Sequence, residues 1–401
     1  HMDRYYNQNE PEISDYDYDQ LMIKLKEAEK EHPEWVTGDS PSQKIGGVAM
    51  REAGVKITHD VPMLSIEDVF DKKDVVSWIE KVREVHPDAE FSVEAKIDGL
   101  SMTLRYEKDT KGRLKLTLAE TRGDGLVGED VTANALVIFD VKQYIDLPYD
   151  SLQLRGEVYM SHEDFDKYNN MQELKGGKLA ANPRNLAAGT LRQLDAGITK
   201  ERGLKMFIFN VQQGPQDLTL SHCKGLDILN DHGVPTVFHK KCTTANEVLE
   251  VIDEIGDLRG QFPFDIDGAV VKIDQVSYRN DFSTSAKYSS GHIAYKYPPE
   301  EKETKLLDVE LSVGRTGRVN PTAIFEPIRL CGTTVSRATL HNQDFIDDLD
   351  IGIGDTIVVY KSGEIIPKIK EVIHSKRPAN TITFKIPNVC PVCGGEVSHD
   401  S

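Results

Sequence analysis

The segment 92–99 places Lys96 between two carboxylates, Glu94 and Asp98, at alternate positions. Alternate side chains of a β-strand share one face, so these three charged groups are predicted to project together. The other face is apolar and is predicted to pack into a core: Phe91, Val93, Ala95 and Ile97. Burial and nearby cations would lower the pKa of Lys96 from about 10.4 and make it a nucleophile. The alternative is a solvated strand face with no chemical role.

Further motifs containing charged residues follow in the sequence. They are Thr121-Arg122-Gly123-Asp124-Gly125, Arg155-Gly156-Glu157-Val158, Asn182-Pro183-Arg184-Asn185, Leu191-Arg192-Gln193-Leu194-Asp195, Phe264-Asp265-Ile266-Asp267-Gly268-Ala269-Val270-Val271-Lys272 and Ala294-Tyr295-Lys296-Tyr297-Pro298. After Lys96-Ile97-Asp98-Gly99, this order resembles that of covalent nucleotidyltransferases and, more specifically, of NAD-dependent bacterial DNA ligases. The resemblance covers essentially the whole chain.

The resemblance implies a reaction. In that family a lysine, here Lys96, attacks the α-phosphate of NAD, forms a phosphoramide with AMP and expels nicotinamide mononucleotide. AMP then passes to the 5′-phosphate of nicked double-stranded DNA, and the 3′-hydroxyl displaces it and closes the nick. Magnesium is expected to assist these phosphoryl transfers. NAD is therefore expected as an AMP donor and not as a hydride carrier.

The resemblance also assigns residues to the nucleotide. It places Glu94 and Arg122 on the adenosine and Glu157 on the ribose hydroxyls, which suits a carboxylate acceptor. Lys272 and Lys296 are expected to embrace the α-phosphate. Phe209 falls where the family often has a tyrosine beside the adenine, and the alternative for this ring is core packing.

Other charged residues have less specific expected roles. Basic positions expected for the phosphates or nicotinamide mononucleotide are Arg184, Arg192 and Arg259, with ordinary ion pairing as the alternative. Asp98 and Asp267 are expected to orient Lys96 and Lys272, or to help hold magnesium through water. The alternative for Asp267 is a turn carboxylate before Gly268.

An N-terminal helix is predicted over residues 14–32, ending before Pro33. Residues matching the family's nicotinamide mononucleotide patch lie in and before it: Tyr5, Tyr6, Asp15, Tyr18 and Asp19. The last three have i, i+3, i+4 spacing and can line one helical patch, although Tyr18 could instead pack in a core. Ser65 and Ile66 match another family contact.

The region from about residue 305 contains short strand patterns broken by Gly and Pro, which predict a small β-barrel of the OB-fold type. Arg315, Arg318 and Lys361 are the candidates there for contacts with DNA phosphates. Cys390 and Cys393 form half of a four-cysteine zinc site, and no second pair follows. We therefore expect zinc only in a longer protein, and we expect this chain to load AMP but to seal nicks poorly.

The predicted fold class is α+β, a nucleotidyltransferase domain with a helical N-terminal domain and a C-terminal OB-fold. The predicted boundaries are 1–52 for the helical NAD-recognition domain, 53–300 for the nucleotidyltransferase domain, 301–380 for the OB-fold and 381–401 for the start of a zinc finger. Two alternatives use the same residues differently. Gly123-x-Gly125-x-x-Gly128 matches a Rossmann fingerprint, but the acidic residue expected about 20 positions later is poorly matched. An ATP- or GTP-using relative is opposed by the N-terminal Tyr/Asp patch.

Composition narrows the class of protein less sharply. The net charge of −18 argues against a non-catalytic nucleic-acid-binding module, although residues 310–377 carry no net charge, with 9 basic and 9 acidic side chains. The 5 cysteines are sparse and odd in number, which favours reduced thiols in the cytoplasm. No apolar run predicts a membrane span or secretory leader. We expect a monomer.

Overall fold

The computed structural model describes residues 15–37, 40–42, 55–180, 182–282, 288–314, 317–330, 333–362 and 366–398. The chain divides into two units, a larger one containing Asp17–Pro298 and a smaller one containing Pro299–Ser401, and each is described by itself. Tyr5, Tyr6 and Arg315, expected to bind ligand, lie outside the described residues. Nothing is described of the side chains of Asp15 and Asp19.

The predicted N-terminal helix is confirmed as α2 (Asp15–Glu31), followed by the short 3-10 helix η1 (Pro33–Trp35). The helix ends before Pro33 because proline lacks the backbone donor that a continued helix needs. Lys26 of α2 lies 4.9 Å from the ring centroid of Tyr288, which places this helix against the beginning of a strand in the larger unit.

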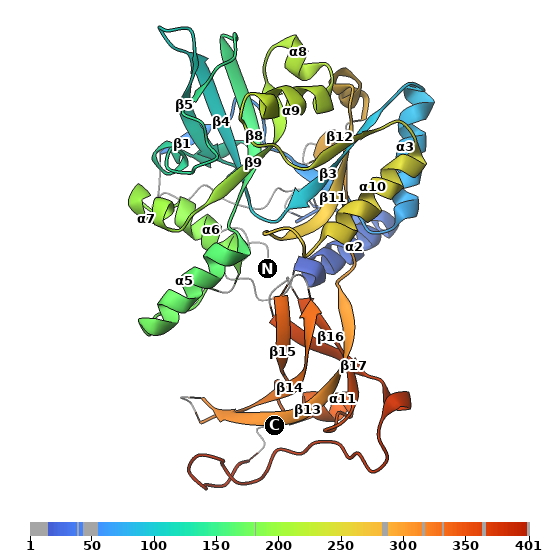
Figure 1. The fold of residues 1–401 in the computed structure, drawn as a ribbon. Coiled ribbons are helices and arrows are strands. Elements are labelled where there is room, and N and C mark those ends of the chain that lie inside the picture. Colours follow the sequence, from blue (N-terminus) through green and yellow to red (C-terminus); the bar gives the residue numbers. More distant parts are fainter. Residues whose placement is uncertain are drawn as a thin grey trace. The chain divides into compact units, whose positions relative to one another are not determined.

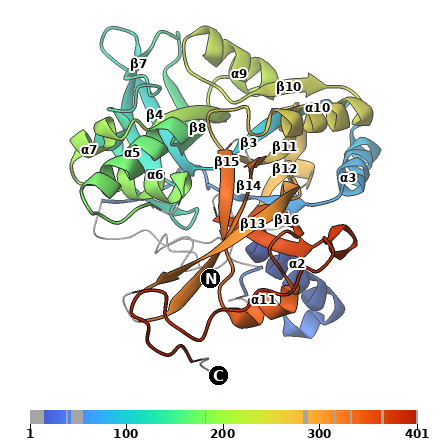
Figure 2. The same cartoon turned by 60° about the horizontal axis from the view of Figure 1, so that its bottom comes forward.

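The larger unit contains a mixed sheet that carries Lys96, here called the lysine sheet. Its order is β10 (His239–Cys242), β3 (Phe91–Ile97), β11 (Ile266–Ile273), β12 (Tyr288–Lys296) and β2 (Ser65–Val69). Helices α3 (Lys72–Val85) and α10 (Ala245–Leu258) cover one face, as Figure 1 and Figure 2 show. That face holds the predicted apolar row, all of it buried: Phe91, Val93, Ala95 and Ile97.

A second sheet follows the order β7 (Tyr144–Ile145), β5 (Leu114–Thr121), β4 (Leu100–Lys108), β8 (Ser151–Tyr159) and β9 (Lys205–Gln213). Its apolar face packs a separate core that includes Leu104, Leu154, Leu186 and Leu226. The helices near this sheet are α4 (Thr132–Ala135), α5 (His162–Leu174), α6 (Pro183–Leu191), α7 (Ala196–Glu201), α8 (Gln216–Thr219) and α9 (His222–Asp231). Figure 2 shows α5, α6 and α7 beside its strands. This unit also contains a small antiparallel pair of strands, β1 (Lys56–Thr58) and β6 (Val127–Glu129), and the 3-10 helix η2 (Val276–Phe282).

The smaller unit is built on strands β13 (Glu301–Val313), β14 (Val319–Leu330), β15 (Thr333–Thr339), β16 (Thr356–Ser362) and β17 (Ile366–Val372). Helix α11 (Gln343–Leu349) separates β15 from β16, and η3 (His374–Lys376) follows β17. The sheet order is β15-β14-β13-β16-β17, and β15 also approaches β17, so the two ends of the order meet as in a barrel. The predicted strands are confirmed. However, β13 begins at Glu301, slightly before the region in which strand patterns are predicted.

Both units therefore follow the predicted mixture of helices and sheets. Among the described residues, no helix combines the length and the apolar character needed to cross a membrane.

Candidate active site around Lys96

Lys96 and Lys296 lie in one row across the lysine sheet. Strand register pairs Gly268 of β11 with Lys96 of β3 on one side and with Lys296 of β12 on the other. Glycine at the middle position leaves the space between the two lysines open, and an added Cβ would lie only 2.4 Å from the carbonyl oxygen of Tyr295. The sheet thus places two ammonium groups on the same face without a side chain between them.

Asp267 joins these two lysines. Both of its carboxylate oxygens lie 3.0 Å from Lys96 Nζ, and Oδ2 lies 2.7 Å from Lys296 Nζ. A register shift between Ile266 and Gly268 makes a β-bulge at Asp267. A bulge can turn a side chain toward the face opposite to the one that strict alternation predicts. Of the two lysines that Asp98 and Asp267 were expected to orient, Lys96 is bonded by Asp267, whereas Lys272 pairs with Glu94.

The charge state of Lys96 also differs from the sequence prediction. Burial lowers the pKa of Lys96, and Lys296 acts in the same direction, but the carboxylates of Asp267 and Asp68 raise the pKa to above its ordinary value. Burial opposes the ionisation of Asp267, yet the two lysines hold its pKa well below the ordinary range. In the protein without substrate, Lys96 is therefore a paired ammonium group and not a ready nucleophile.

Glu94 occupies a separate pocket on the same sheet face. It is 1% exposed, and its Oε2 lies 2.6 Å from Lys272 Nζ while Oε1 accepts hydrogen bonds from Ser92 and His222. Burial opposes ionisation, but Lys272 and His222 hold the pKa of Glu94 well below its ordinary value. Burial in turn lowers the pKa of His222 to about 4, so the imidazole is neutral and donates its ring hydrogen to Glu94.

Lys272 therefore belongs to the Glu94 pocket. Its Nζ donates to the carbonyl oxygen of Phe209 at 2.7 Å and lies 5.1 Å from the centroid of that ring. Burial lowers the pKa of Lys272, and Glu94 opposes this shift. Lys272 and Lys296, both expected to embrace the α-phosphate, thus have different carboxylate partners, because Lys296 shares Asp267 with Lys96.

The second sheet contributes Glu157 and Arg155 from β8 and Arg122 from the end of β5. Burial raises the pKa of Glu157 to about 7, although the positive charges of Lys96, Arg155 and Arg122 act to lower it. Burial and the nearby Arg122 lower the pKa of Arg155 to about 10. These mutual effects place Glu157 close to both Lys96 and Arg122, so the polar faces of the two sheets border one site.

The other predicted basic residues have partners of different kinds. Arg184 Nη1 lies 3.2 Å from Asp98 Oδ1, and Arg192 Nε lies 3.8 Å from Glu129 Oε2. Arg259 donates to the carbonyl oxygen of Pro298 at 3.0 Å. The three charges of segment 92–99 that were predicted to project together therefore have separate partners: Glu94 with Lys272, Lys96 with Asp267 and Asp98 with Arg184.

The remaining candidates are more scattered. Tyr18 is half-buried on α2, and Ser65 and Ile66 are half-buried in β2, the edge strand of the lysine sheet. In the smaller unit Arg318 is exposed, whereas Lys361 is only 7% exposed, unlike a side chain on an open DNA-binding surface.

The two C-terminal cysteines lie in a tight turn. The carbonyl oxygen of Cys390 accepts from Gly394 N at 3.0 Å, and Cys390 N donates to Gly395 O at 2.7 Å. Backbone hydrogen bonds from Cys393 and Val392 lower the pKa of the Cys390 thiol. This turn fits two of the four donors of a zinc site; among the described residues, no group of three or more metal-binding side chains is found.

Comparison with protein families decides the class of this chain. Residues 52–300 match the NAD-dependent DNA ligase adenylation domain, residues 303–381 match the NAD-dependent DNA ligase OB-fold domain, and residues 1–46 match the DNA ligase-like, N-terminal NAD+-binding domain. This chain belongs to the NAD-dependent DNA ligase family. The predicted family resemblance is confirmed.

Curated members of the NAD-dependent DNA ligase family match along nearly the whole chain. A DNA ligase of Clostridium kluyveri is 45% identical over 99% of this chain and 59% of its own length, and one of Thermoanaerobacter sp. is 47% identical over 98% and 59%. The chain thus spans about three-fifths of the length of these relatives. Among solved structures, a Chlorella virus DNA ligase-adenylate matches 78% of this chain and 99% of its own with 10% identity and a TM-score of 0.30; the family assignment rests on the sequence matches.

In this NAD-dependent DNA ligase family member, sequence reasoning missed Ser92, Arg155 and His222. Ser92 and Arg155 had an available signal, since each lies two positions from a predicted ligand-binding glutamate in a strand. His222 begins α9 and reaches Glu94 from 128 positions away, so no local pattern announces it.

Proposed function

We propose that this chain transfers AMP from NAD to Lys96 as the first step in joining nicked double-stranded DNA. The observation that carries the proposal is the arrangement of Lys96, Lys296 and Asp267, in which two ammonium groups share one carboxylate at 2.7–3.0 Å. An α-phosphate can bind to these two lysines beside that carboxylate. Preorganised cations stabilise the negative charge that develops during phosphoryl transfer.

In the proposed step, Lys96 Nζ forms a bond to the α-phosphorus. The bond from that phosphorus to the bridging oxygen breaks, and nicotinamide mononucleotide leaves with the electron pair. Lys96 must first lose a proton, and Asp267 is the carboxylate within hydrogen-bond distance to receive it. As phosphate draws Lys296 away, Asp267 becomes a better proton acceptor.

The nucleoside would be held on either side of this centre. Glu94 is kept ionised by Lys272 and His222 and can accept hydrogen bonds from the adenine, as the family resemblance implies. Glu157 and Arg122 are proposed to face the ribose and the adenosine. Phe209, whose ring centroid lies 5.1 Å from Lys272 Nζ and 5.5 Å from Arg155 Cζ, is proposed to stack on the base.

The nicotinamide mononucleotide half would lie toward α2 and β2. The residues proposed for this half or for the phosphates keep the roles predicted from sequence: Tyr5, Tyr6, Asp15, Tyr18, Asp19, Ser65, Ile66, Arg184, Arg192 and Arg259. Half-burial of Tyr18 supports this assignment because a ring that retains an accessible edge can still stack on a ligand.

Magnesium and zinc are proposed to bind at different places. Asp267 and Asp98 are both engaged by cationic side chains, so these carboxylates do not fit a magnesium ion held directly by the protein. Magnesium would arrive with the NAD phosphates and water. Cys390 and Cys393 supply half of the donors of a zinc site in a longer protein.

The later steps would use DNA. Transfer of AMP to a 5′-phosphate and displacement by a 3′-hydroxyl follow from family membership, and exposed Arg318 is the best supported candidate for a phosphate contact. Arg315 stays a candidate, while burial weakens the case for Lys361. We further propose a monomer that acts in the cytoplasm, in keeping with its few cysteines.

The test is intact mass after incubation with NAD and magnesium, compared with ATP and GTP. We expect a gain of one AMP from NAD alone, loss of that gain in Lys96→Ala, and normal loading in Lys115→Ala, which removes an exposed strand lysine. No gain in protein shown to arrive without AMP would overturn the proposal. A gain that persists in Lys96→Ala would show that another residue is the nucleophile.

A further inference from the structure

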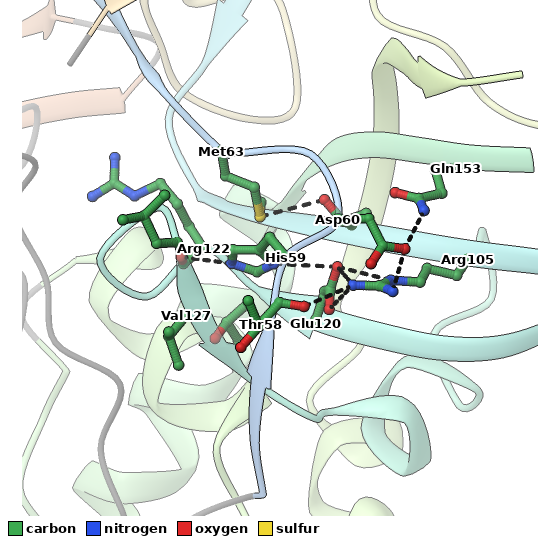
Figure 3. Close-up of polar contacts among 12 residues, drawn as sticks. Thr58, His59, Asp60, Met63, Arg105, Glu120, Arg122, Val127 and Gln153 are labelled. Atoms are coloured by element: carbon green, nitrogen blue, oxygen red, sulfur yellow. Dashed lines mark hydrogen bonds and ion pairs between the residues drawn. The ribbon is translucent and has the colours of Figure 1, made fainter. Parts of the chain in front are cut away.

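The turn that carries Arg122 is held by a segment that precedes the lysine sheet. His59 N donates to Leu126 O at 2.9 Å, and Met63 N donates to Gly125 O at 2.8 Å. Strand β1 pairs with β6 just beside these contacts. The segment 58–63 thus follows the Arg122 turn along its backbone (Figure 3).

The His59 ring makes the contact closest to Arg122. Its Nε2 lies 3.0 Å from the carbonyl oxygen of Arg122, and because a carbonyl can only accept, the ring nitrogen donates. The same carbonyl accepts from Gly125 N at 2.9 Å, which closes the turn. Figure 3 shows the Arg122 side chain extending away from the ring while its carbonyl faces the ring.

The other edge of the ring faces a buried charge network, although Nδ1 makes no hydrogen bond to it. Nδ1 of His59 lies 3.2 Å from Glu120 Oε1, and both side chains are 1% exposed. Arg105 grips both oxygens of Glu120 at 2.9 Å. Arg105 also bonds to Asp60 Oδ2 at 2.6 Å, and Gln153 donates to the same oxygen at 2.9 Å. Neighbouring strands β5, β4 and β8 therefore set the position of the imidazole.

Space around the ring is as restricted as its polar contacts. A Cβ added at Gly128 would lie 2.8 Å from His59 Cε1, so the imidazole packs directly on the backbone of β6. Gly123 and Gly125 have φ of +56° and +92°, a backbone conformation that is unfavourable for residues with a Cβ. The glycines define the bend, but the imidazole fixes where the bend lies relative to the second sheet.

Arg122 is close enough to the site for its position to matter. Its charge lowers the pKa of both Glu157 and Arg155, and Glu157 also responds to Lys96. A displacement of the turn would therefore move a positive charge relative to the carboxylate proposed for the ribose. Misplacing such a group weakens ligand binding before it affects the reacting atoms.

We infer that His59 is a positioning residue that fixes Arg122 for nucleotide binding through the Nε2 contact with the Arg122 carbonyl. This inference rests on the proposed function. It assigns to His59 no contact with substrate. Its effect should be on the concentration of NAD that half-saturates AMP loading, and not on the maximal rate set around Lys96.

The test uses two substitutions that separate the ring nitrogens. His59→Gln can place an amide nitrogen near the Nε2 position, whereas His59→Asn reaches only as far as Nδ1 and loses the Arg122 contact. In single-turnover AMP loading, we expect His59→Asn to raise the half-saturating NAD concentration about ten-fold, the scale of one lost hydrogen bond. The maximal rate should change less than about two-fold, and His59→Gln should restore most of the affinity.

Two further measurements distinguish positioning from general damage. Tyr106→Phe removes another buried side-chain bond to a backbone carbonyl, Tyr106 to Lys142 at 2.7 Å, from β4 of the same sheet. It should lower the unfolding midpoint comparably without changing NAD affinity. In an Arg122→Ala background, His59→Asn should raise the half-saturating NAD concentration by less than about two-fold more, because the effects of residues that act through one another are not additive.

The outcomes separate this inference from the proposed function. Suppose that the wild type loads AMP and that the effects of His59→Asn and Arg122→Ala on the half-saturating NAD concentration multiply fully in the double variant. His59 then does not act through Arg122. The same conclusion holds if His59→Asn lowers only the maximal rate. If His59→Asn does not fold, Glu120→Gln gives the same test, with an expected loss of affinity of about three-fold that disappears in Arg122→Ala. Absence of AMP loading in wild type would overturn the proposed function, and this inference with it.

Discussion

Individual charged residues in this site differ in how fully their charges are compensated. Glu94 has Lys272 and His222 within contact, and Asp267 has two lysines. Glu157 has positive neighbours that act on it, but burial dominates and raises its pKa to about 7. The carboxylate proposed to bind the ribose is thus kept in a state that costs stability.

Glu157→Gln should therefore stabilise the protein in a pH-dependent way. Because the folded pKa exceeds the unfolded value of 4.5, the penalty is absent below that value, grows as pH rises and is complete above about 7. The expected gain in unfolding free energy at pH 8 is at most about 3 kcal/mol, from about 1.4 kcal/mol per pKa unit. Chemical denaturation should show that this gain shrinks toward pH 5. The Glu157→Gln variant should also load AMP less well than the wild type. An equal gain at both pH values would show that ionisation is not its cause.

At the scale of elements, the lysine sheet brings its charges together through register. Gly268 between Lys96 and Lys296 and the bulge at Asp267 are both features of β11. A strand with ordinary side chains at these positions would separate the two lysines or turn Asp267 to the opposite face. The chemistry proposed for Lys96 therefore depends on backbone geometry one strand away.

Gly268→Ala tests this dependence. The new Cβ would meet the backbone oxygen of Tyr295 at 2.4 Å, so β11 and β12 must shift apart, at an expected cost of about 1–3 kcal/mol. AMP loading should fall more than stability alone explains. The matched control is Gly189→Ala in α6, where nothing lies within 4 Å and a gain of about 0.5–1 kcal/mol is expected. Unchanged unfolding and loading in Gly268→Ala would contradict the role of this row.

The sequence could predict local features of the site but not the contacts between distant residues. Alternation in segment 91–97 predicted the strand and its apolar face, because the alternation of side chains along a strand is a local property. It did not predict that Ser92 and Glu94 on the opposite face are buried as well. The partners of the charges were not predictable. The contact of His222 with Glu94 spans 128 positions, and the bulge that turns Asp267 toward Lys96 breaks the alternation on which the prediction relied. The pKa of Lys96 was misjudged for this reason: burial is the largest single influence, but Asp267, with its hydrogen bond, and Asp68 together outweigh it.

At the scale of the whole molecule, each unit has its own apolar core. The core of the smaller unit draws on residues between Leu306 and Ile386, within the second unit alone. Arg377, after β17, bonds to both oxygens of Asp355 at 2.8 Å and to Asp350 at 2.9 Å. Asp355 is fully buried, so this arginine compensates a charge that water cannot reach.

Residues 299–401 should consequently fold when expressed alone, with cooperative unfolding seen by circular dichroism. Arg377→Ala should destabilise this fragment by about 3 kcal/mol, because it leaves Asp355 buried without its partner. Lys376→Ala is the matched control, since its ion pair with Glu303 is half exposed and should contribute less than about 1 kcal/mol. In the whole chain, Arg377→Ala should lower one unfolding transition and leave the other, with AMP loading on Lys96, unchanged. A fragment without cooperative unfolding, or a loss of AMP loading in folded Arg377→Ala, would mean that the smaller unit does not hold its structure independently of the larger one.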